Sequence, residues 1–239
     1  MNTTINKKTK FIDLGLIDYQ QAWDHQANLF QLILDIKSQN RTLPANYLLP
    51  TANYLLFCEH PHVFTLGKSG DENNLLVKKE DLHTIDAAYY HINRGGDITY
   101  HGPGQVVVYP ILDLENFFTD IHQYMRLLEE SVIQTLEELN IKAGRIKGLT
   151  GVWVDHENEK AARKICALGV KTSRWVTMHG LAFNVNTQLD YFNRIVPCGI
   201  NNKAVTSLEK ELQGKQDVEH IKFILKEKIG ALFEMEIIN

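Results

Sequence analysis

Cys198 and Lys164 are the two residues of this chain whose types and settings could form a nucleophilic pair. Cys198 follows Pro197, which fixes its own φ, and precedes Gly199, which tolerates unusual backbone angles. The thiol is therefore expected on a tight turn rather than inside a regular element, where a free cysteine is usually a packing residue. At its ordinary pKa of about 8.5, a thiol is only a few per cent ionised at neutral pH. A nearby ammonium would lower that pKa, and a neutral lysine would instead take the thiol proton.

Lys164 begins an alternating segment, KICALGVK over residues 164–171, which is typical of a β-strand. On a regular strand, Lys164, Cys166 and Leu168 share one face. A lysine among apolar neighbours is seldom buried without a reason. The functional interpretation is a partner for Cys198, and the alternative is a strand-edge lysine whose ammonium stays in water. Both interpretations stay open here, because the two residues lie 34 positions apart in the chain.

A glycine-rich segment, RGGDITYHGPGQ over residues 94–105, holds four of the 15 glycines. It lacks the Lys-Ser/Thr pair of a phosphate loop, and its glycine spacing is not that of a dinucleotide fingerprint. An apolar run over residues 106–109 follows, which indicates a strand. Clustered glycines before a strand allow a sharp turn or the close approach of a ligand to the backbone. The segment is therefore either a ligand-binding loop or a long structural turn.

The segment CEHPH places three potential metal ligands at alternate positions, Cys58, His60 and His62. Pro61 interrupts the strand geometry, and three candidates are fewer than the four ligands of a structural zinc site. The sequence therefore predicts neither a metal site nor a cofactor. Cys58 and Cys166 are interpreted as packing residues.

Composition excludes several classes of protein. The chain has 25 Lys+Arg against 29 Asp+Glu, a net charge of −4, and no basic cluster, which argues against nucleic-acid binding. Its 44% apolar content excludes disorder, and no apolar run approaches a membrane span of about 20 residues. Asp13 and Asp18 interrupt the apolar residues near the start, so no secretory signal is expected. Three cysteines fit a reducing compartment, and we expect a cytoplasmic location.

Three amphipathic helices are expected to begin after Asp18, Asp120 and Asp217, because apolar residues then recur at helical spacing. Strands are expected over residues 54–57, 63–66, 89–93, 106–109, 151–155, 164–171 and 181–186. A turn at residues 156–159 makes its two flanking strands antiparallel. The pattern predicts an α+β fold, a mixed and largely antiparallel sheet covered by helices. We expect one domain over residues 1–239, with residues 1–10 flexible and 213–239 forming a C-terminal helical segment.

Five segments, in this order and spacing, resemble the lipoyl(octanoyl) transferase family, the octanoyltransferases of lipoate biosynthesis. The resemblance covers roughly residues 10–212. Its segments are EHPHVFTLG (59–67), RGGDITYHGPGQ (94–105), KICALG (164–169), HGLAFNVN (179–186) and RIVPCG (194–199). The resemblance implies a fold similar to the catalytic domains of biotin protein ligases and lipoate ligases.

The resemblance also implies roles for individual residues. The nucleophile of the family falls on Cys198 and its activating lysine on Lys164. His101 and the accessory residue His179 are candidates for positioning or proton transfer, and a structural hydrogen-bonding role is the alternative for each. The implied substrate contacts are Arg94, Gly95, Gly96, Asp97, Ile98, Thr99, Tyr100, His101, Ala167, Leu168, Gly169, Gly180, Leu181 and Ala182.

The implied reaction transfers an octanoyl group from octanoyl-acyl carrier protein to a lysine of lipoyl domains, through an octanoyl-Cys198 thioester. The implied acceptors are lipoyl domains of 2-oxoacid dehydrogenase complexes and the glycine cleavage H protein, with no nucleic-acid or membrane partner. One thioester replaces another of similar energy, so no ATP is required.

The sequence leaves three alternative functions. An ATP-dependent lipoate or biotin ligase shares the implied fold, but the chain lacks a GRGR-type nucleotide loop and a ligase has no need of the cysteine. A non-catalytic binding protein has no chemical requirement for both Lys164 and Cys198. A Cys–His hydrolase would need a thioester open to water, and no cysteine-protease signature is present.

Overall fold

The computed structural model describes residues 5–196 and 204–238, and a large mixed sheet organises this part of the chain. Nine strands among the described residues follow the order β12-β1-β2-β6-β10-β9-β8-β7, with β11 beside β9. They are β1 (Lys8–Leu16), β2 (Asn53–Glu59), β6 (Gln105–Ile111), β7 (Ala143–Ile146), β8 (Leu149–Val154), β9 (Arg163–Ser173), β10 (Val176–Asn184), β11 (Ala204–Val205) and β12 (Glu236–Ile238). Only the β1–β2, β1–β12 and β9–β11 pairs of these described strands are parallel. The predicted mixed, largely antiparallel sheet is confirmed.

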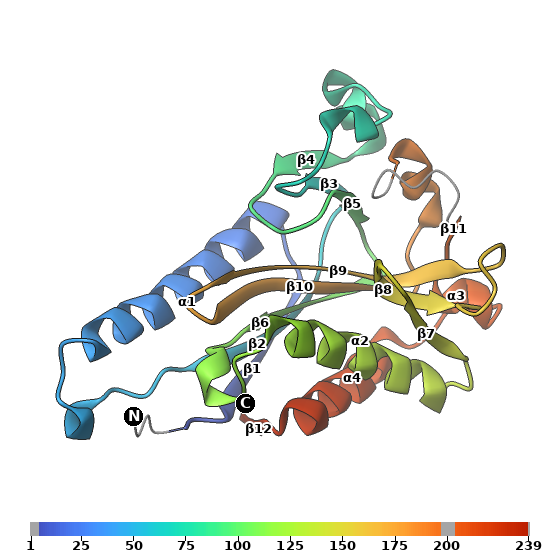
Figure 1. The fold of residues 1–239 in the computed structure, drawn as a ribbon. Coiled ribbons are helices and arrows are strands. Elements are labelled where there is room, and N and C mark those ends of the chain that lie inside the picture. The colour runs from blue at the N-terminus through green and yellow to red at the C-terminus, as the bar shows by residue number, and fades with distance from the viewer. Residues whose placement is uncertain (1–4, 197–203, 239) are drawn as a thin grey trace.

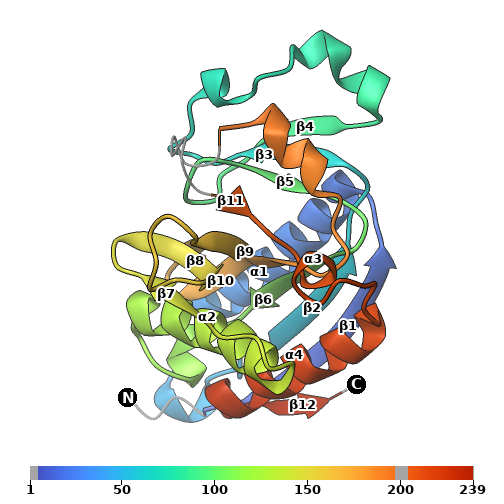
Figure 2. The ribbon, with the colours of Figure 1, turned by 90° about the vertical axis from the view of Figure 1, so that its right-hand side faces the viewer.

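A second, three-stranded sheet stands above the large one in both ribbon views (Figures 1 and 2). Its central strand β3 (Val63–Leu66) pairs in parallel with β4 (Ala88–His91) and antiparallel with β5 (Ile98–His101). The glycine-rich residues 94–97 join β4 to β5 within the small sheet, and the Gly95 N–H donates to the Val170 carbonyl of β9, so this segment contacts the large sheet.

Helices cover both faces of the large sheet (Figure 1). α1 (Tyr19–Asn40) packs on one face, whereas α2 (Ile121–Glu138) and α4 (Val218–Phe233) pack together on the other. A short helix, α3 (Leu208–Glu211), precedes α4. Five 3-10 turns complete the elements of the described residues: η1 (Ala45–Tyr47), η2 (Glu72–Asn74), η3 (Lys79–Ile85), η4 (Leu114–Asn116) and η5 (Leu189–Arg194).

The three long helices begin where the sequence predicts. The side chains of Asp18, Asp120 and Asp217 each accept backbone N–H groups of the first helical turn. An aspartate at this position satisfies donors that have no partner within the helix. The predicted turn at 156–159 also joins antiparallel strands, β8 and β9.

Apolar stripes of the helices form the core. On one face, Leu128 and Val132 of α2 and Leu225 and Ile229 of α4 are fully buried against the sheet. On the other face, α1 contributes a separate cluster that includes Ile33. Burial of these side chains is the main favourable term for folding. None of the helices in the described residues has the length and apolar character needed to cross a membrane.

The amino-terminal expectation requires a correction. Residues 8–10, predicted to belong to a flexible end, form the start of β1 and pair with both β2 and β12. Thr9 is buried, and Asn53 donates through its side-chain amide to the carbonyls of Asn6 and Lys8. Polar composition suggested a frayed end, whereas contacts with distant strands order it.

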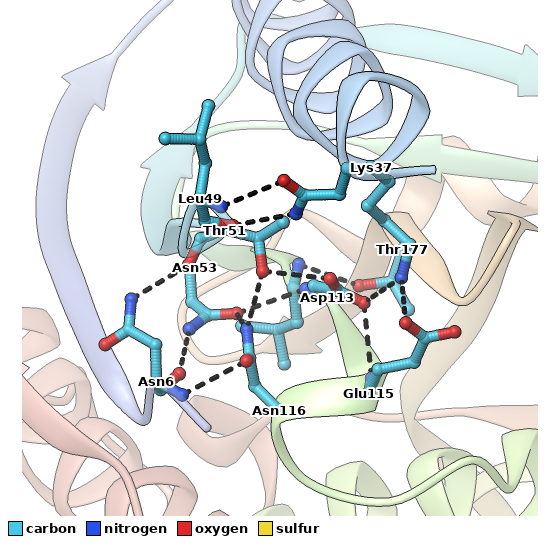
Figure 3. Close-up of polar contacts among 11 residues, drawn as sticks. Asn6, Lys37, Leu49, Thr51, Asn53, Asp113, Glu115, Asn116 and Thr177 are labelled. Atoms are coloured by element: carbon cyan, nitrogen blue, oxygen red, sulfur yellow. Dashed lines mark hydrogen bonds and ion pairs between the residues drawn. The ribbon is translucent and has the colours of Figure 1, made fainter. Parts of the chain in front are cut away.

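A buried polar network lies where α1, β1, β2 and the end of β6 meet (Figure 3). Asp113 accepts from Lys37 Nζ at 2.5 Å and from Thr51 Oγ1 at 2.9 Å. Asn116 extends the network to Thr51 at 2.9 Å. Lys37 also reaches Glu115 at 2.8 Å, but the Glu115 side chain is 44% exposed against 5% for Asp113. Asp113 is therefore the buried carboxylate that pairs with the Lys37 ammonium.

The network makes stability depend on Asp113 far more than on Glu115. Asp113→Ala should lower the free energy of unfolding by about 3 kcal/mol, because it leaves the buried Lys37 ammonium and Thr51 hydroxyl without their shared acceptor. Glu115→Ala, the matched control, should cost less than about 1 kcal/mol. Urea denaturation of both variants measures the difference, and equal losses would contradict this account.

Candidate active site

A cavity of about 540 Å³ opens between the two sheets. Fifteen of the residues implied by the sequence resemblance line it. They are Lys164, Arg94, Gly95, Gly96, Asp97, Ile98, Thr99, His101, Ala167, Leu168, Gly169, His179, Gly180, Leu181 and Ala182. Segments far apart in sequence therefore meet in one place, which is the arrangement expected of a binding site.

Tyr100 does not line this cavity. Strand alternation in β5 turns its ring to the opposite side, where it is buried against Phe64, Tyr191 and Phe192. Its hydroxyl lies 2.7 Å from His62 Nδ1. The implied substrate contact at this position is therefore replaced by a packing role in the small sheet, while neighbouring residues of β5 face the cavity.

The glycine-rich segment lies directly on β9. Gly95 donates its N–H to the carbonyl of Val170 at 3.0 Å. A Cβ on Gly169 would lie 2.5 Å from Arg94 Nη1, and a Cβ on Gly180 would lie 2.1 Å from the Val108 carbonyl oxygen. Both distances are too short for any side chain, so the absence of a Cβ permits this packing.

Arg94 holds the loop that carries it. Its Nη1 donates to the Gly95 carbonyl and its Nη2 to the Asp97 carbonyl, each at 2.8 Å. The guanidinium is thus fixed at the cavity wall by backbone acceptors, and its charge remains at the site.

Buried histidines beside the cavity are neutral at pH 7. His101 Nδ1 lies 2.8 Å from Gln105 Oε1, and His60 Nε2 lies 2.8 Å from the Tyr109 hydroxyl. Burial lowers the pKa of His101 to about 3 and that of His60 to about 4. The ring of Tyr19 stacks on His101, with centroids 5.9 Å apart. These imidazoles therefore act as hydrogen-bonding groups rather than charges.

His179 is held by both its backbone and its ring. Its φ is +60°, an uncommon value for a residue other than glycine. Its N–H donates to Gln26 Oε1 at 3.0 Å, and its Nε2 lies 3.3 Å from Asn93 Oδ1. Burial lowers the pKa of His179 to about 3, so this ring is also neutral.

The predicted shared face of Lys164, Cys166 and Leu168 is wrong for Lys164. Val152 of β8 pairs with Cys166, but the next residue, Trp153, pairs with Lys164, so β9 carries one extra residue at this point. Such a β-bulge changes the alternation of side chains. Cys166 joins the core beneath α2, whereas Lys164 lines the cavity and lies against the face of the Trp153 ring.

Cys198 lies outside the described residues. The chain on either side of it does reach the cavity, because Phe192 and Val205 both line it. Val196 donates its N–H to the Asn74 carbonyl at 2.8 Å, and Thr206 donates to the Lys164 carbonyl at 2.9 Å. The described residues on either side of this gap therefore lie beside Asn74, for Val196, and beside Lys164, for Thr206.

The other two thiols are buried in the core. Burial raises the pKa of Cys58 and of Cys166 well above the ordinary value, so neither ionises at neutral pH. Near Cys58, His60 bonds to Tyr109 while His62 stacks on Tyr191. No group of three His, Cys, Asp or Glu side chains in the described parts of the chain is arranged to hold a metal ion.

Several residues at the site were not singled out from the sequence. Gln105 donates to Asn184 Oδ1 at 2.9 Å, and Asn184 donates to the Thr206 carbonyl at 3.0 Å. Both lie within the recognised segments, which was the available signal. Tyr19 and Tyr109 had no such signal, because each reads as a core aromatic residue of a helix or strand.

Comparisons with known proteins agree with this geometry. Residues 18–230 match the family described as the lipoyl protein ligase A/B catalytic domain. The chain is 57% identical over 239 residues to an octanoyltransferase of Cytophaga hutchinsonii, covering 100% of this chain and 98% of that protein.

Two solved structures share the fold. Lipoate-protein ligase A bound with ATP has a TM-score of 0.65 at 13% identity, covering 98% of this chain and 90% of its own. Biotin protein ligase from Aquifex aeolicus, in complex with biotin and ATP, has a TM-score of 0.52 at 15% identity, covering 94% and 70%. The implied likeness to both ligase folds is confirmed.

Because His101 is buried in its neutral form, the free energy of unfolding should decrease in acid. The folded pKa is about 3. The unfolded value is about 6.5, so below that pH the unfolded chain binds a proton that the folded chain does not. Stability should fall from pH 6.5 towards pH 3, with His101 contributing about 2 kcal/mol of the loss at pH 5.

His101→Gln should therefore lose less stability than the wild type between pH 7 and pH 5, measured by urea denaturation. His122→Gln, at an exposed position of α2, is the control and should keep the wild-type dependence. An unchanged dependence in His101→Gln would show that the buried imidazole is not responsible.

Proposed function

The chain belongs to the lipoyl protein ligase A/B catalytic-domain family and is an octanoyltransferase, and we propose that it carries the octanoyl group on Cys198. The observation that supports this route most directly is the position of Lys164. Its side chain lines the cavity, and Val205 and Thr206, a few residues after Cys198 in the chain, lie beside Lys164. An activated thiol next to a substrate cavity is the arrangement that thioester exchange requires.

In the first half of the proposed reaction, the Cys198 thiolate attacks the carbonyl carbon of the donor thioester. A new carbon–sulfur bond forms to Cys198, and the bond to the donor sulfur breaks. The Lys164 ammonium gives its proton to the departing thiolate. The products are octanoyl-Cys198, a neutral Lys164 and the free donor thiol.

In the second half, the lysine amine of the acceptor attacks octanoyl-Cys198. An amide bond forms, and the carbon–sulfur bond to Cys198 breaks. Neutral Lys164 takes the proton that the amine loses, which restores the ammonium and the thiolate together. Lys164 thus serves both halves of the reaction without a net change.

The cavity suits an eight-carbon acyl chain. Its volume of about 540 Å³ lies within the range of small-molecule sites. Apolar residues line it, including Val107, Leu168 and Leu181. Arg94 and the backbone of residues 94–97 supply polar groups at the same wall, where the carbonyl end of the acyl group would lie.

The proposed donor is octanoyl-acyl carrier protein. The proposed acceptors are lipoyl domains of 2-oxoacid dehydrogenase complexes and the glycine cleavage H protein. We assign the reaction to the cytoplasm and to one catalytic domain over residues 1–239; a single family model spans residues 18–230.

The Cys198 intermediate can be observed directly. Incubation with octanoyl-acyl carrier protein should add one octanoyl group, seen by intact-protein mass spectrometry. Cys198→Ser should lose the alkylatable thiol and the thioester, whereas Cys58→Ala, at a buried core position, should retain the adduct. An unchanged thioester in Cys198→Ser would overturn the assignment. Loading of free octanoate that depends on ATP would instead favour a ligase.

Lys164 should lower the pKa of the Cys198 thiol. Lys164→Ala should raise that apparent pKa by about one unit or more, measured from the pH dependence of iodoacetamide alkylation. Lys160→Ala, which removes an exposed lysine from the turn before β9, should leave it unmoved. An apparent pKa that does not move in Lys164→Ala would contradict the proposed pairing.

A further inference from the structure

The side chain of Lys164 lies against two residues of β8. Its Nζ is 4.7 Å from the centroid of the Trp153 ring, and its methylene groups pass the backbone of Gly151. The bulge in β9 produces this arrangement, because it pairs Lys164 with Trp153 across the two strands. The lysine is thus held by its neighbours before any substrate enters the cavity.

Trp153 presents a desolvated aromatic face to the ammonium. Trp153 is only 2% exposed, so its ring is almost completely removed from water. The face of an aromatic ring carries negative charge density and attracts a cation within about 6 Å, and tryptophan is the most effective ring. The attraction grows when water is excluded. A neutral amine would gain none of it, so the ring favours the protonated form of Lys164.

The absence of a side chain at Gly151 leaves room for the methylene groups of Lys164. Gly151 adopts a φ of +122°, and a Cβ there would lie 3.2 Å from Lys164 Cε and 2.7 Å from the Cys166 carbonyl oxygen. The Gly151 N–H donates to Glu129 Oε1 at 3.0 Å. Glu129 is completely buried on α2, so this bond ties β8 to α2 at Gly151.

We propose that Trp153 is a positioning residue that keeps Lys164 as an ammonium at the cavity wall. The inference rests on the proposed function, in which Lys164 is paired with Cys198. It decides between the two forms left open by the sequence. Lys164 in the resting enzyme is the counter-ion of a Cys198 thiolate, and it becomes a neutral base only after giving its proton to the departing donor thiol.

Neighbouring charges on the packed elements have partners of their own. Glu129 is paired with Arg126 at 2.6 Å and with Arg145 at 3.0 Å. Arg163, next to Lys164 on β9, is paired with Glu211 at 2.5 Å and with Asp155. Across the cavity, Arg94 donates to backbone carbonyls, and Asp97 accepts from Asn74 at 2.7 Å and from the Ile98 N–H. Replacement of the Trp153 ring changes the environment of the ammonium without adding or removing a charge.

The test compares the pH dependence of octanoyl transfer in Trp153→Leu, Trp153→Phe and the wild type. The alkaline limb of the kcat profile should move to lower pH by about one unit in Trp153→Leu. Trp153→Phe retains a weaker ring and should give a smaller shift in the same direction. KM should change less than kcat, because the ring is buried behind Lys164 rather than exposed to substrate.

A core control separates positioning from packing. Phe57→Leu removes a fully buried ring from β2 on the same side of the sheet as α2 and should lower stability without moving either limb of the profile. If Trp153→Leu does not fold, Trp153→Phe still carries the test. Unmoved limbs in the folded Trp153 variants would overturn the inference. If Lys164→Ala also fails to move the thiol pKa, the failure lies in the proposed function instead.

Discussion

One extra residue in β9 determines which side of the large sheet Lys164 faces. Without the bulge opposite Val152 and Trp153, strand alternation would place Lys164 on the same face as Cys166, beneath α2. An ammonium there would lose its hydration in an apolar core. With the bulge, the lysine faces the cavity and Cys166 stays in the core. The position of Lys164 at the cavity wall and its contact with the Trp153 ring both follow from that local change of face.

The ionisable groups around the cavity differ in whether they keep their charge when water is excluded. Exclusion of water removes the charge from His101 and His179, which bond to Gln105 and Asn93 as neutral rings. The guanidinium of Arg94 keeps its charge because arginine does not lose its proton at neutral pH, and the carbonyls of Gly95 and Asp97 accept its hydrogen bonds. These two described imidazoles are thus engaged with amide side chains. That is a different arrangement from the Cys–His pair of a hydrolase, in which an imidazole is aimed at the nucleophile.

Local sequence signals predicted the elements well, and tertiary effects account for the errors. Asp18, Asp120 and Asp217 start their helices because a cap depends only on the next turn. The whole of β1 was absent from the expected strands, since its order comes from β2 and β12, which are distant in sequence. The side of Lys164 was also mispredicted, because a bulge has no signature in a run of alternating residues. The resemblance located most of the cavity lining, but it could not separate Tyr100 from the neighbours that face the other way.

Glycine at Gly169 and Gly180 has a consequence for how this site can evolve. Each lies where a Cβ would meet a neighbouring atom within 2.5 Å. Tolerance to mutation should therefore differ between neighbouring positions. Gly169 and Gly180 should not accept even alanine, whereas Leu168 and Ala182 beside them can exchange among apolar residues of similar volume. The backbone conformation of the site should therefore stay the same as the sequence diverges. Divergence in acyl-chain preference is then confined to the few side chains that fill the space around it.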